Sequence, residues 1–232
     1  MQRNNTERIS QAFLNFYTET VNSHSYLQFC KEIQGSPVHS YNMLSKTQWK
    51  HFFEHLTTID KDSQVLDLAM GSGHILQFIE NEYHLKGFGV DILQSSIIPE
   101  MKTRYRQLDL NTSFVIQDQY DFIYCLDGFY NIPKKEKKIE QLVNNLNKNG
   151  SLYLTFSETK EARLVERKLP AFEKYDFSVQ DQLMWELSSE YIEQHKDNLP
   201  SLIYQTKRLE IDKFLKLHKG KKINRYSYIF YK

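Results

Sequence analysis

Apolar residues recur at two different spacings along this chain. Over the first sixty residues they recur every three or four positions, as in Ile9–Tyr17 and Trp49–Leu56, and this spacing predicts amphipathic helices. Further along, short apolar runs alternate with helical stretches, and these runs cover residues 65–69, 86–91, 105–110, 122–126 and 151–156. Strands that alternate with helices predict an α/β fold with an open, mostly parallel sheet and helices on both faces.

The same pattern predicts elements between and after these strands. A helix is expected within residues 95–106, interrupted early by Pro99, and another has its apolar stripe at residues 139–146. The pair Asn149-Gly150 is typical of the C-terminal end of that second helix. In the tail we expect a strand at 175–178, helices over 179–218 with a break at Pro200, and an aromatic-rich last strand at 226–231.

Composition narrows the class of protein. The 232 residues include 30 basic and 29 acidic side chains, and this balance argues against nucleic acid as the main partner. The basic runs at 134–138 and 219–222 are therefore interpreted as solvated surfaces. We expect no signal peptide and no membrane span, because the N-terminus is polar and no apolar run approaches roughly 20 residues. Cys30 and Cys125 favour two buried thiols over a disulfide or a metal site, which is typical of a cytoplasmic protein.

Glycine is scarce in this chain and concentrated in one part of it. Six of the eight glycines lie between residues 71 and 150. In residues 65–75 a strand ends, Gly71 and Gly73 permit a tight turn, and a helix begins, so main-chain N–H groups can contact a ligand directly. Asp91, at the end of the next strand, is placed to accept hydrogen bonds from ribose hydroxyls. Together these features predict a site for an adenosine-containing cofactor.

Two further residues narrow the choice of cofactor. Leu76 stands where a dinucleotide-binding turn has its third glycine, which disfavours a nicotinamide-dependent reductase. Asp67 lies inside an apolar strand, four residues before Gly71, where a buried carboxylate without a partner is costly. A carboxylate at this point suits a cationic ligand better than a pyrophosphate. S-adenosylmethionine (SAM) carries both an ammonium group and a positively charged sulfur.

Five segments, in order, resemble the motifs of the class I SAM-dependent methyltransferases. They are residues 67–73, 89–92, 107–110, 120–127 and 146–152. The first segment resembles the family's acid-x-Gly-x-Gly-x-Gly motif, with Ala69 in place of the first glycine. Asp91 matches the acid of the second motif. Asp109 matches the acid of the third motif, which faces the adenine amino group in the family. The resemblance implies a Rossmann-like doubly wound sheet, mostly parallel with an antiparallel last strand, and helical cap segments at both ends of the chain.

The resemblance also implies which residues form the site. The expected cofactor-binding residues are Asp67, Ala69, Met70, Gly71, Gly73, Asp91, Ile92, Asp109, Leu110, Cys125 and Tyr41. The candidates for acceptor binding are His39, Asp127, Tyr130 and Trp185, and Asp127 and Tyr130 are also the candidates for catalysis. Residues 1–58 are expected to form N-terminal helices that cover the active site, and residues 59–232 the cofactor-binding core with a helical insertion at about 159–218.

The nature of the acceptor stays open at this stage. Residues 127–132 lack the Asn/Asp-Pro-Pro-Tyr sequence of methyltransferases that act on DNA or protein glutamine, and the tail is similar to that of a group of bacterial methyltransferases. We therefore expect methyl transfer to a nitrogen, oxygen or carbon atom of a small molecule, by a monomer or homodimer. The alternatives are an RNA- or protein-directed methyltransferase and a non-catalytic SAM-binding regulatory protein.

Overall fold

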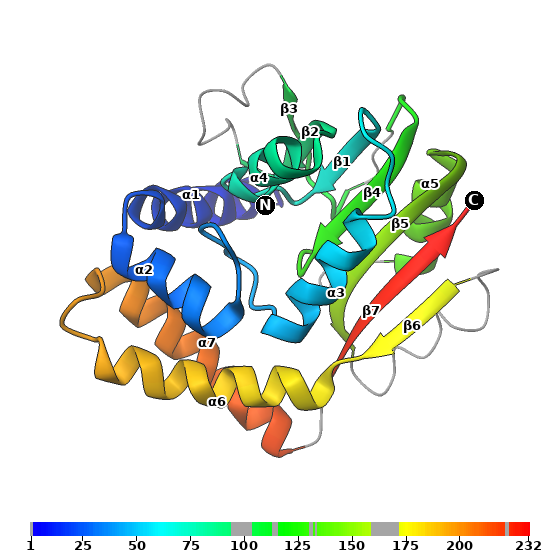
Figure 1. Ribbon diagram of the computed structural model, residues 1–232. Coiled ribbons are helices and arrows are strands. Elements are labelled where there is room, and N and C mark those ends of the chain that lie inside the picture. The colour runs from blue at the N-terminus through cyan, green and yellow to red at the C-terminus, as the bar shows by residue number, and fades with distance from the viewer. Residues whose placement is uncertain are drawn as a thin grey trace.

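Within the described residues, seven strands of the computed structural model form one sheet (Figure 1). The structure describes residues 2–93, 104–112, 116–129, 132, 134–158, 172–220 and 223–232. The strands are β1 (Gln64–Leu68), β2 (Lys86–Asp91), β3 (Tyr105–Gln107), β4 (Tyr120–Leu126), β5 (Leu146–Glu158), β6 (Phe172–Asp176) and β7 (Asn224–Tyr231). Their order across the sheet is β3-β2-β1-β4-β5-β7-β6.

The strand directions agree with the predicted fold class. Strand β1 pairs in parallel with β2 and β4, β2 with β3, and β4 with β5, whereas β7 runs antiparallel to both β5 and β6. Parallel neighbours need crossover connections, and helix α4 (His74–Tyr83) connects β1 to β2 while α5 (Lys135–Asn144) connects β4 to β5. The α/β class, the mostly parallel sheet and the antiparallel last strand are confirmed.

Buried apolar side chains cover both faces of the sheet, as strands packed between helices require. Alternate residues of β4 point to opposite faces, so Ile123 and Cys125 belong to one buried cluster while Phe122 and Tyr124 belong to the other. Helix α5 contributes to the first cluster, and α3 (Lys46–Leu56) and α4 contribute to the second. Cys125 and Cys30 are both buried free thiols, as predicted.

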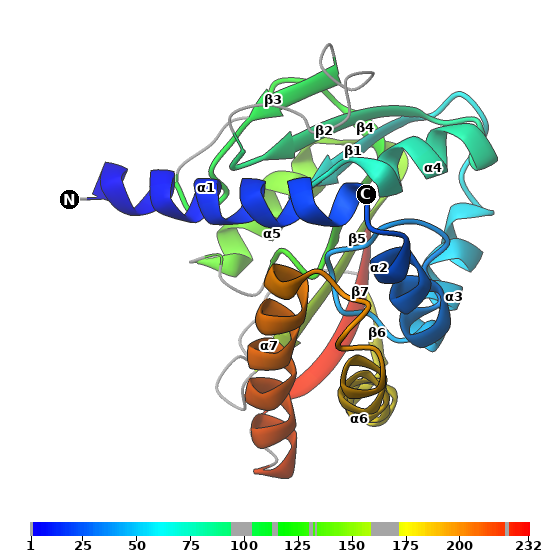
Figure 2. The same cartoon turned by 90° about the vertical axis from the view of Figure 1, so that its left-hand side faces the viewer.

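The helices of the two ends of the chain pack together beside the sheet (Figures 1 and 2). They are α1 (Gln2–Val21), α2 (His24–Phe29), the π-helical turn Cys30–Gln34, α6 (Ser178–Gln194) and α7 (Ser201–Lys219). They share a third buried cluster that includes Phe16, Tyr26, Trp185 and Ile203. In Figure 2, α1 crosses the N-terminal end of α7, and these two helices are in contact. None of the helices within the described ranges is long and apolar enough to span a bilayer.

The Asn149-Gly150 pair does not end a helix, so that prediction is wrong. Helix α5 already ends at Asn144, and β5 begins at Leu146. Asn149 has φ +67°, and the pairing of β4 with β5 changes register nearby. A Cβ on Gly150 would lie 2.9 Å from the carbonyl oxygen of Asp121. The pair therefore forms an irregularity inside β5, where a close backbone approach requires glycine.

Other boundaries differ by a few residues from the predicted ones. Strand β3 ends at Gln107, and the tail strand ends at Asp176. The Asp176 carboxylate accepts a hydrogen bond from the Ser178 N–H at 2.9 Å, and α6 begins at Ser178, where the prediction still had strand. The predicted break at Pro200 is confirmed, because α7 begins directly after it. The helix predicted at 95–106 lies largely outside the described residues, and its last two residues belong to β3.

Candidate active site

A cavity of about 250 Å³ brings most of the predicted site residues together. It lies beyond the carboxyl ends of β1, β2, β3 and β4, which is where open α/β sheets bind their ligands. Residues of α1, of the loop 39–42 and of α7 complete its wall. The predicted residues that line it are His39, Tyr41, Ala69, Met70, Gly71, Asp91, Ile92, Asp109, Leu110 and Asp127.

The turn after β1 adopts backbone conformations that favour glycine. Ala69, Gly71 and Gly73 have φ values of +63°, +61° and +89°. A Cβ on Gly71 would lie 2.6 Å from the hydroxyl oxygen of Tyr17, so this position has no room for a side chain. Gly73 is the N-cap of α4 and lies next to the lining rather than in it. Ala69 keeps the left-handed conformation at a strain of about 1–2 kcal/mol, since its Cβ crowds the backbone there.

Asp91 ties the glycine turn to the end of β2. Its Oδ2 accepts a hydrogen bond from the Gly71 N–H at 2.8 Å, and its Oδ1 accepts one from the Leu93 N–H at 3.1 Å. Burial raises the pKa of this carboxyl, and the backbone N–H donors oppose that shift. Just beyond β3, Asp109 accepts a hydrogen bond from the Asn111 N–H at 2.9 Å. Two adjacent strands thus each place a carboxylate in the cavity wall.

Asp67 lies within β1, beneath the cavity rather than among its described lining residues. It is 4% exposed, and its Oδ2 accepts a hydrogen bond from the Tyr124 hydroxyl at 2.7 Å. Burial raises the pKa of Asp67 to about 8, the Tyr124 hydrogen bond lowers it, and the charge of Asp91 raises it further. Tyr124, on the neighbouring strand β4, is therefore the protein's own partner for this buried acid.

Asp127 is held at the cavity by a buried ion pair. It follows β4 with φ +64°, and its Oδ1 lies 2.6 Å from Nη1 of Arg225 on β7. Its Oδ2 accepts a hydrogen bond from the Met43 N–H at 3.2 Å. Burial raises the pKa of Asp127, whereas the charge of Arg225 lowers it. Both carboxylate oxygens are thus engaged by the protein, so Asp127 fixes the wall of the cavity as well as facing into it.

The wall formed by the terminal helices carries residues that the sequence pattern did not single out. Phe13 and Tyr17 of α1 pack around Tyr41, with ring centroids 5.6 and 4.6 Å from its own. Glu210 of α7 also lines the cavity, and its Oε2 lies 2.9 Å from Nζ of Lys207. Further lining residues that were not predicted as site residues are Asn42, Ser72, Ile75, Leu108, Asn111, Leu126, Gly128 and Ile132. The only sequence signal for Phe13 and Tyr17 is the helical spacing of residues 9–17, which predicts a helix and not a ligand site.

His39 lines the cavity as a neutral ring. Its Nε2 donates a hydrogen bond to the Ser23 carbonyl at 3.1 Å, and burial lowers its pKa. The ring of His74 lies 5.3 Å away, and burial lowers the pKa of His74 to about 4. His39 therefore offers a hydrogen-bonding ring, and not a positive charge, to a ligand at neutral pH.

Three other predicted site residues are placed elsewhere or not described. Trp185 lies in the core of the terminal helices, where its ring stacks on Phe214 at 4.5 Å and its Nε1 donates to Asp181 at 3.2 Å. Its large apolar surface is thus buried away from the cavity. Cys125 is buried in the core of the sheet, behind the lining. Tyr130 lies outside the described residues.

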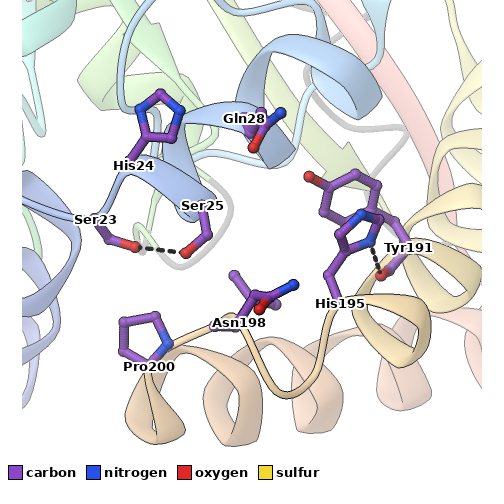
Figure 3. Close-up of a pocket in the computed structure, with 9 residues that line it drawn as sticks. Ser23, His24, Ser25, Gln28, Tyr191, His195, Asn198 and Pro200 are labelled. Carbon is purple, nitrogen blue, oxygen red and sulfur yellow. Dashed lines mark hydrogen bonds between the residues drawn. The ribbon is translucent and has the colours of Figure 1, made fainter.

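A second cavity, of about 690 Å³, is a more open surface hollow between α2 and the connection from α6 to α7 (Figure 3). His24, Gln28 and Asn198 in its lining are exposed. The ring of His195 stacks on Tyr191, and its Nδ1 donates to the Tyr191 carbonyl at 2.9 Å. None of the predicted site residues is among its described lining, so the cavity at the strand ends is the candidate active site.

Residues 41–195 match the model of a family described as a methyltransferase domain. The matched range covers more than half of the chain and includes the glycine turn, Asp91, Asp109 and Asp127. Comparison with curated protein sequences gives no match.

Several solved structures share this fold at low sequence identity. Phosphoethanolamine N-methyltransferase 2 from Haemonchus contortus, in complex with phosphomonomethylethanolamine and S-adenosylhomocysteine, has a TM-score of 0.70 at 14% identity, over 95% of this chain and 60% of that one. Coclaurine N-methyltransferase bound to N-methylheliamine and S-adenosylhomocysteine has a TM-score of 0.63 at 14% identity, over 92% and 82% of the two chains. The cyclopropane synthase MmaA2 from Mycobacterium tuberculosis has a TM-score of 0.66 at 12% identity, over 95% and 98%.

The length of the match and the strand order lead to one classification. This chain spans 60% of the length of the Haemonchus chain, and such distant structural similarity by itself shows the fold. The family model, in contrast, matches the segment that carries the motifs. The strand order, with β7 antiparallel, is the arrangement that those motifs implied. The chain therefore belongs to the class I SAM-dependent methyltransferases.

Proposed function

We propose that this protein binds SAM in the cavity at the strand ends and transfers its methyl group to a small-molecule acceptor. One observation carries this proposal. The glycine turn after β1, Asp91 at the end of β2 and Asp109 after β3 line the same cavity, although they are separated in the sequence. A turn with accessible backbone beside two acids on adjacent strand ends suits the adenosine part of a ligand.

The residues present fit this cofactor in shape and charge. Gly71 lines the cavity with its backbone alone, and the Tyr17 hydroxyl fills the place where a Cβ would lie, so the turn and the wall from α1 meet directly there. Asp91 and Asp109 line the cavity at the strand ends, and none of the described lining residues is Lys or Arg. A negative wall suits the ammonium group and the sulfonium of SAM. When bound, SAM supplies an activated methyl group on its sulfur.

The protein's own contribution is to align the acceptor and exclude water. Phe13, Tyr17 and Tyr41 form an aromatic part of the cavity wall, and the Tyr17 hydroxyl lies against Gly71 of the turn after β1. We propose that residues 1–58 and the helical insertion at about 159–218 act together as the cap that carries this wall. Their shared buried cluster supports a joint role, since moving one set of helices would disturb the other.

A small-molecule acceptor is supported by the wall of the cavity and by the charge of the chain. Helices α1 and α7 and the loop 39–42 all contribute to the lining, which suits an acceptor of limited size. The balance of 30 basic and 29 acidic residues suits a small molecule better than a polyanion. The names of the Haemonchus enzyme and of coclaurine N-methyltransferase describe small-molecule N-methyltransferases.

Calorimetry tests the assignment of the cofactor site. We expect Asp91→Ala to weaken SAM binding about tenfold or more, because hydrogen bonds to a charged group are worth about 1.5–3 kcal/mol. The control Asp197→Ala, at an exposed position between α6 and α7, is expected to bind like the wild type. Equal affinities of Asp91→Ala and wild type would overturn the ribose assignment.

A screen for S-adenosylhomocysteine release tests the reaction and the acceptor class. Turnover with small molecules and not with RNA or protein is the expected result. Release with RNA or protein alone would replace the small-molecule proposal with a macromolecular one. Tight SAM binding without release of the product across all three classes would identify a non-catalytic SAM-binding protein.

A further inference from the structure

Glu210 stands apart from the other carboxylates of the cavity. Asp91 and Asp109 lie at the strand ends assigned above to the cofactor. Both oxygens of Asp127 are engaged, by Arg225 and by the Met43 N–H. Glu210 enters the cavity from α7, in the cap, and its contacts within the described residues all use Oε2. Its other oxygen, Oε1, is left for a ligand.

The charge of Glu210 is held in place by a buried cation. Lys207 is 1% exposed, and its Nζ lies 2.9 Å from Oε2 of Glu210, whereas the Glu210 side chain is 30% exposed. The same Nζ lies 4.9 Å from the ring centroid of Tyr41 and 5.7 Å from that of Phe16. In this pair the Lys207 ammonium is buried, and the Glu210 carboxylate faces the cavity.

Aromatic rings accompany this carboxylate in the lining. Phe13, Tyr17 and Tyr41 form one packed group, with Tyr17 and Tyr41 ring centroids 4.6 Å apart. The faces of such rings carry negative potential and attract cations. A carboxylate combined with aromatic rings suits a cationic ligand, and the Lys207 ammonium that pairs with Glu210 is buried and is not among the described lining residues.

We infer that the methyl acceptor is a small amine, bound in its cationic form through Glu210 and the rings of Phe13, Tyr17 and Tyr41. This inference rests on the proposed function, because it names the acceptor class of the same cavity. When such an acceptor is methylated, its ammonium first gives up one proton to water, and the freed lone pair forms the new N–C bond. The electrons of the broken S–C bond stay on sulfur. Glu210 is thus a specificity residue, and its position on α7 gives the cap a direct role in choosing the acceptor.

Binding of two matched probes tests the inference on the protein saturated with S-adenosylhomocysteine. Choline carries a permanent positive charge, and 3,3-dimethylbutan-1-ol has the same shape with a neutral tert-butyl group. By calorimetry we expect the wild type to bind choline about tenfold or more tightly than the neutral analogue. Comparable affinities for the two probes, or no binding of choline, would overturn the inference. Failure to bind S-adenosylhomocysteine would instead count against the proposed function.

Substitutions in the ion pair separate recognition from a purely structural role. Glu210→Gln is expected to weaken choline binding about tenfold while the affinity for S-adenosylhomocysteine stays the same. Lys207→Met is expected to keep or strengthen choline binding, because the Glu210 carboxylate is kept and the Lys207 ammonium no longer competes with choline for it. The control Glu193→Gln removes an exposed acid that pairs with Arg208 on α7, and is expected to change neither affinity. Equal loss of choline binding in Glu210→Gln and Lys207→Met would show that the pair only supports the fold.

Discussion

The guanidinium of Arg225 and the carboxylate of Asp127 lie 2.6 Å apart, although 98 residues separate them in the sequence. Arg225 stands on the last strand, β7, and Asp127 follows β4 at the cavity. A second nitrogen of the same guanidinium donates to the Met43 carbonyl at 3.0 Å. Three distant parts of the chain that surround the cavity are therefore joined by one buried cation.

Removing one partner of this ion pair is expected to destabilise the protein strongly. Asp127→Ala leaves the guanidinium of Arg225 buried without its main counter-ion, and the free energy of unfolding should fall by about 3–5 kcal/mol. The surface pair of Arg208 with Asp212 provides the control, because Asp212 is exposed and Asp212→Ala should cost less than about 1 kcal/mol. Urea unfolding followed by circular dichroism measures both. Similar small losses in the two variants would contradict this account.

Ala69→Gly is expected to stabilise the protein. Ala69 has φ +63°, a conformation that costs an L-residue about 1–2 kcal/mol and glycine almost nothing. The free energy of unfolding should therefore rise by roughly 1 kcal/mol. This gain is reduced in part because glycine gives the unfolded chain more conformational entropy. The same change at Ala12, an exposed position in the helix α1, should lower it by about 1 kcal/mol. Urea unfolding of both variants measures whether stability rises or falls in each. A loss of stability in Ala69→Gly would rule out the strain at Ala69.

The buried carboxyl of Asp67 predicts a pH dependence of stability. Its pKa is raised by burial from 3.8 to about 8, so the folded protein holds more protons than the unfolded chain between about pH 4 and pH 8. The free energy of unfolding should therefore fall as the pH rises through this window, by up to about 1.4 kcal/mol per pH unit from this group. Asp67→Asn cannot ionise and should lose that part of the slope.

Urea unfolding at several pH values between about 5 and 8 measures this slope. Asp197→Asn, at an exposed position, serves as the control and should keep the slope of the wild type. An unchanged slope in Asp67→Asn would mean that Asp67 is already ionised in the folded protein at low pH.

Gly71→Val is expected to abolish SAM binding. The backbone at this position has φ +61°, and a Cβ would lie 2.6 Å from the Tyr17 hydroxyl oxygen, so the β-branched side chain strains the turn and displaces Tyr17 in the cavity wall. Calorimetry should show a loss of affinity of about 100-fold or more. Circular dichroism distinguishes a blocked site from an unfolded protein, and normal SAM affinity in a folded variant would refute the role of the turn.

The sequence by itself determined the cofactor side of this protein. The turn at 67–73 and Asp91 each lie at the end of a short apolar strand, and such strands can be recognised in the sequence. The conformation of the turn is also predictable, because it depends on the local sterics of its glycines. The alternation of strands and helices likewise indicated the parallel sheet, because its period can be read along the chain. The Asn149-Gly150 pair misled this reasoning, since the same two residues suit both a helix end and an irregular strand.

The tertiary structure alone decided the long-range partners of the buried charges and the part of the cavity wall that α1, the loop 39–42 and α7 form. Tyr124 meets Asp67 and Arg225 meets Asp127, and these two contacts cross 57 and 98 residues. The aromatic rings of α1 reach the loop 39–42 in the same way. No local pattern marks such contacts, because a side chain's pKa, partner and exposure depend on the elements that the whole fold packs around it.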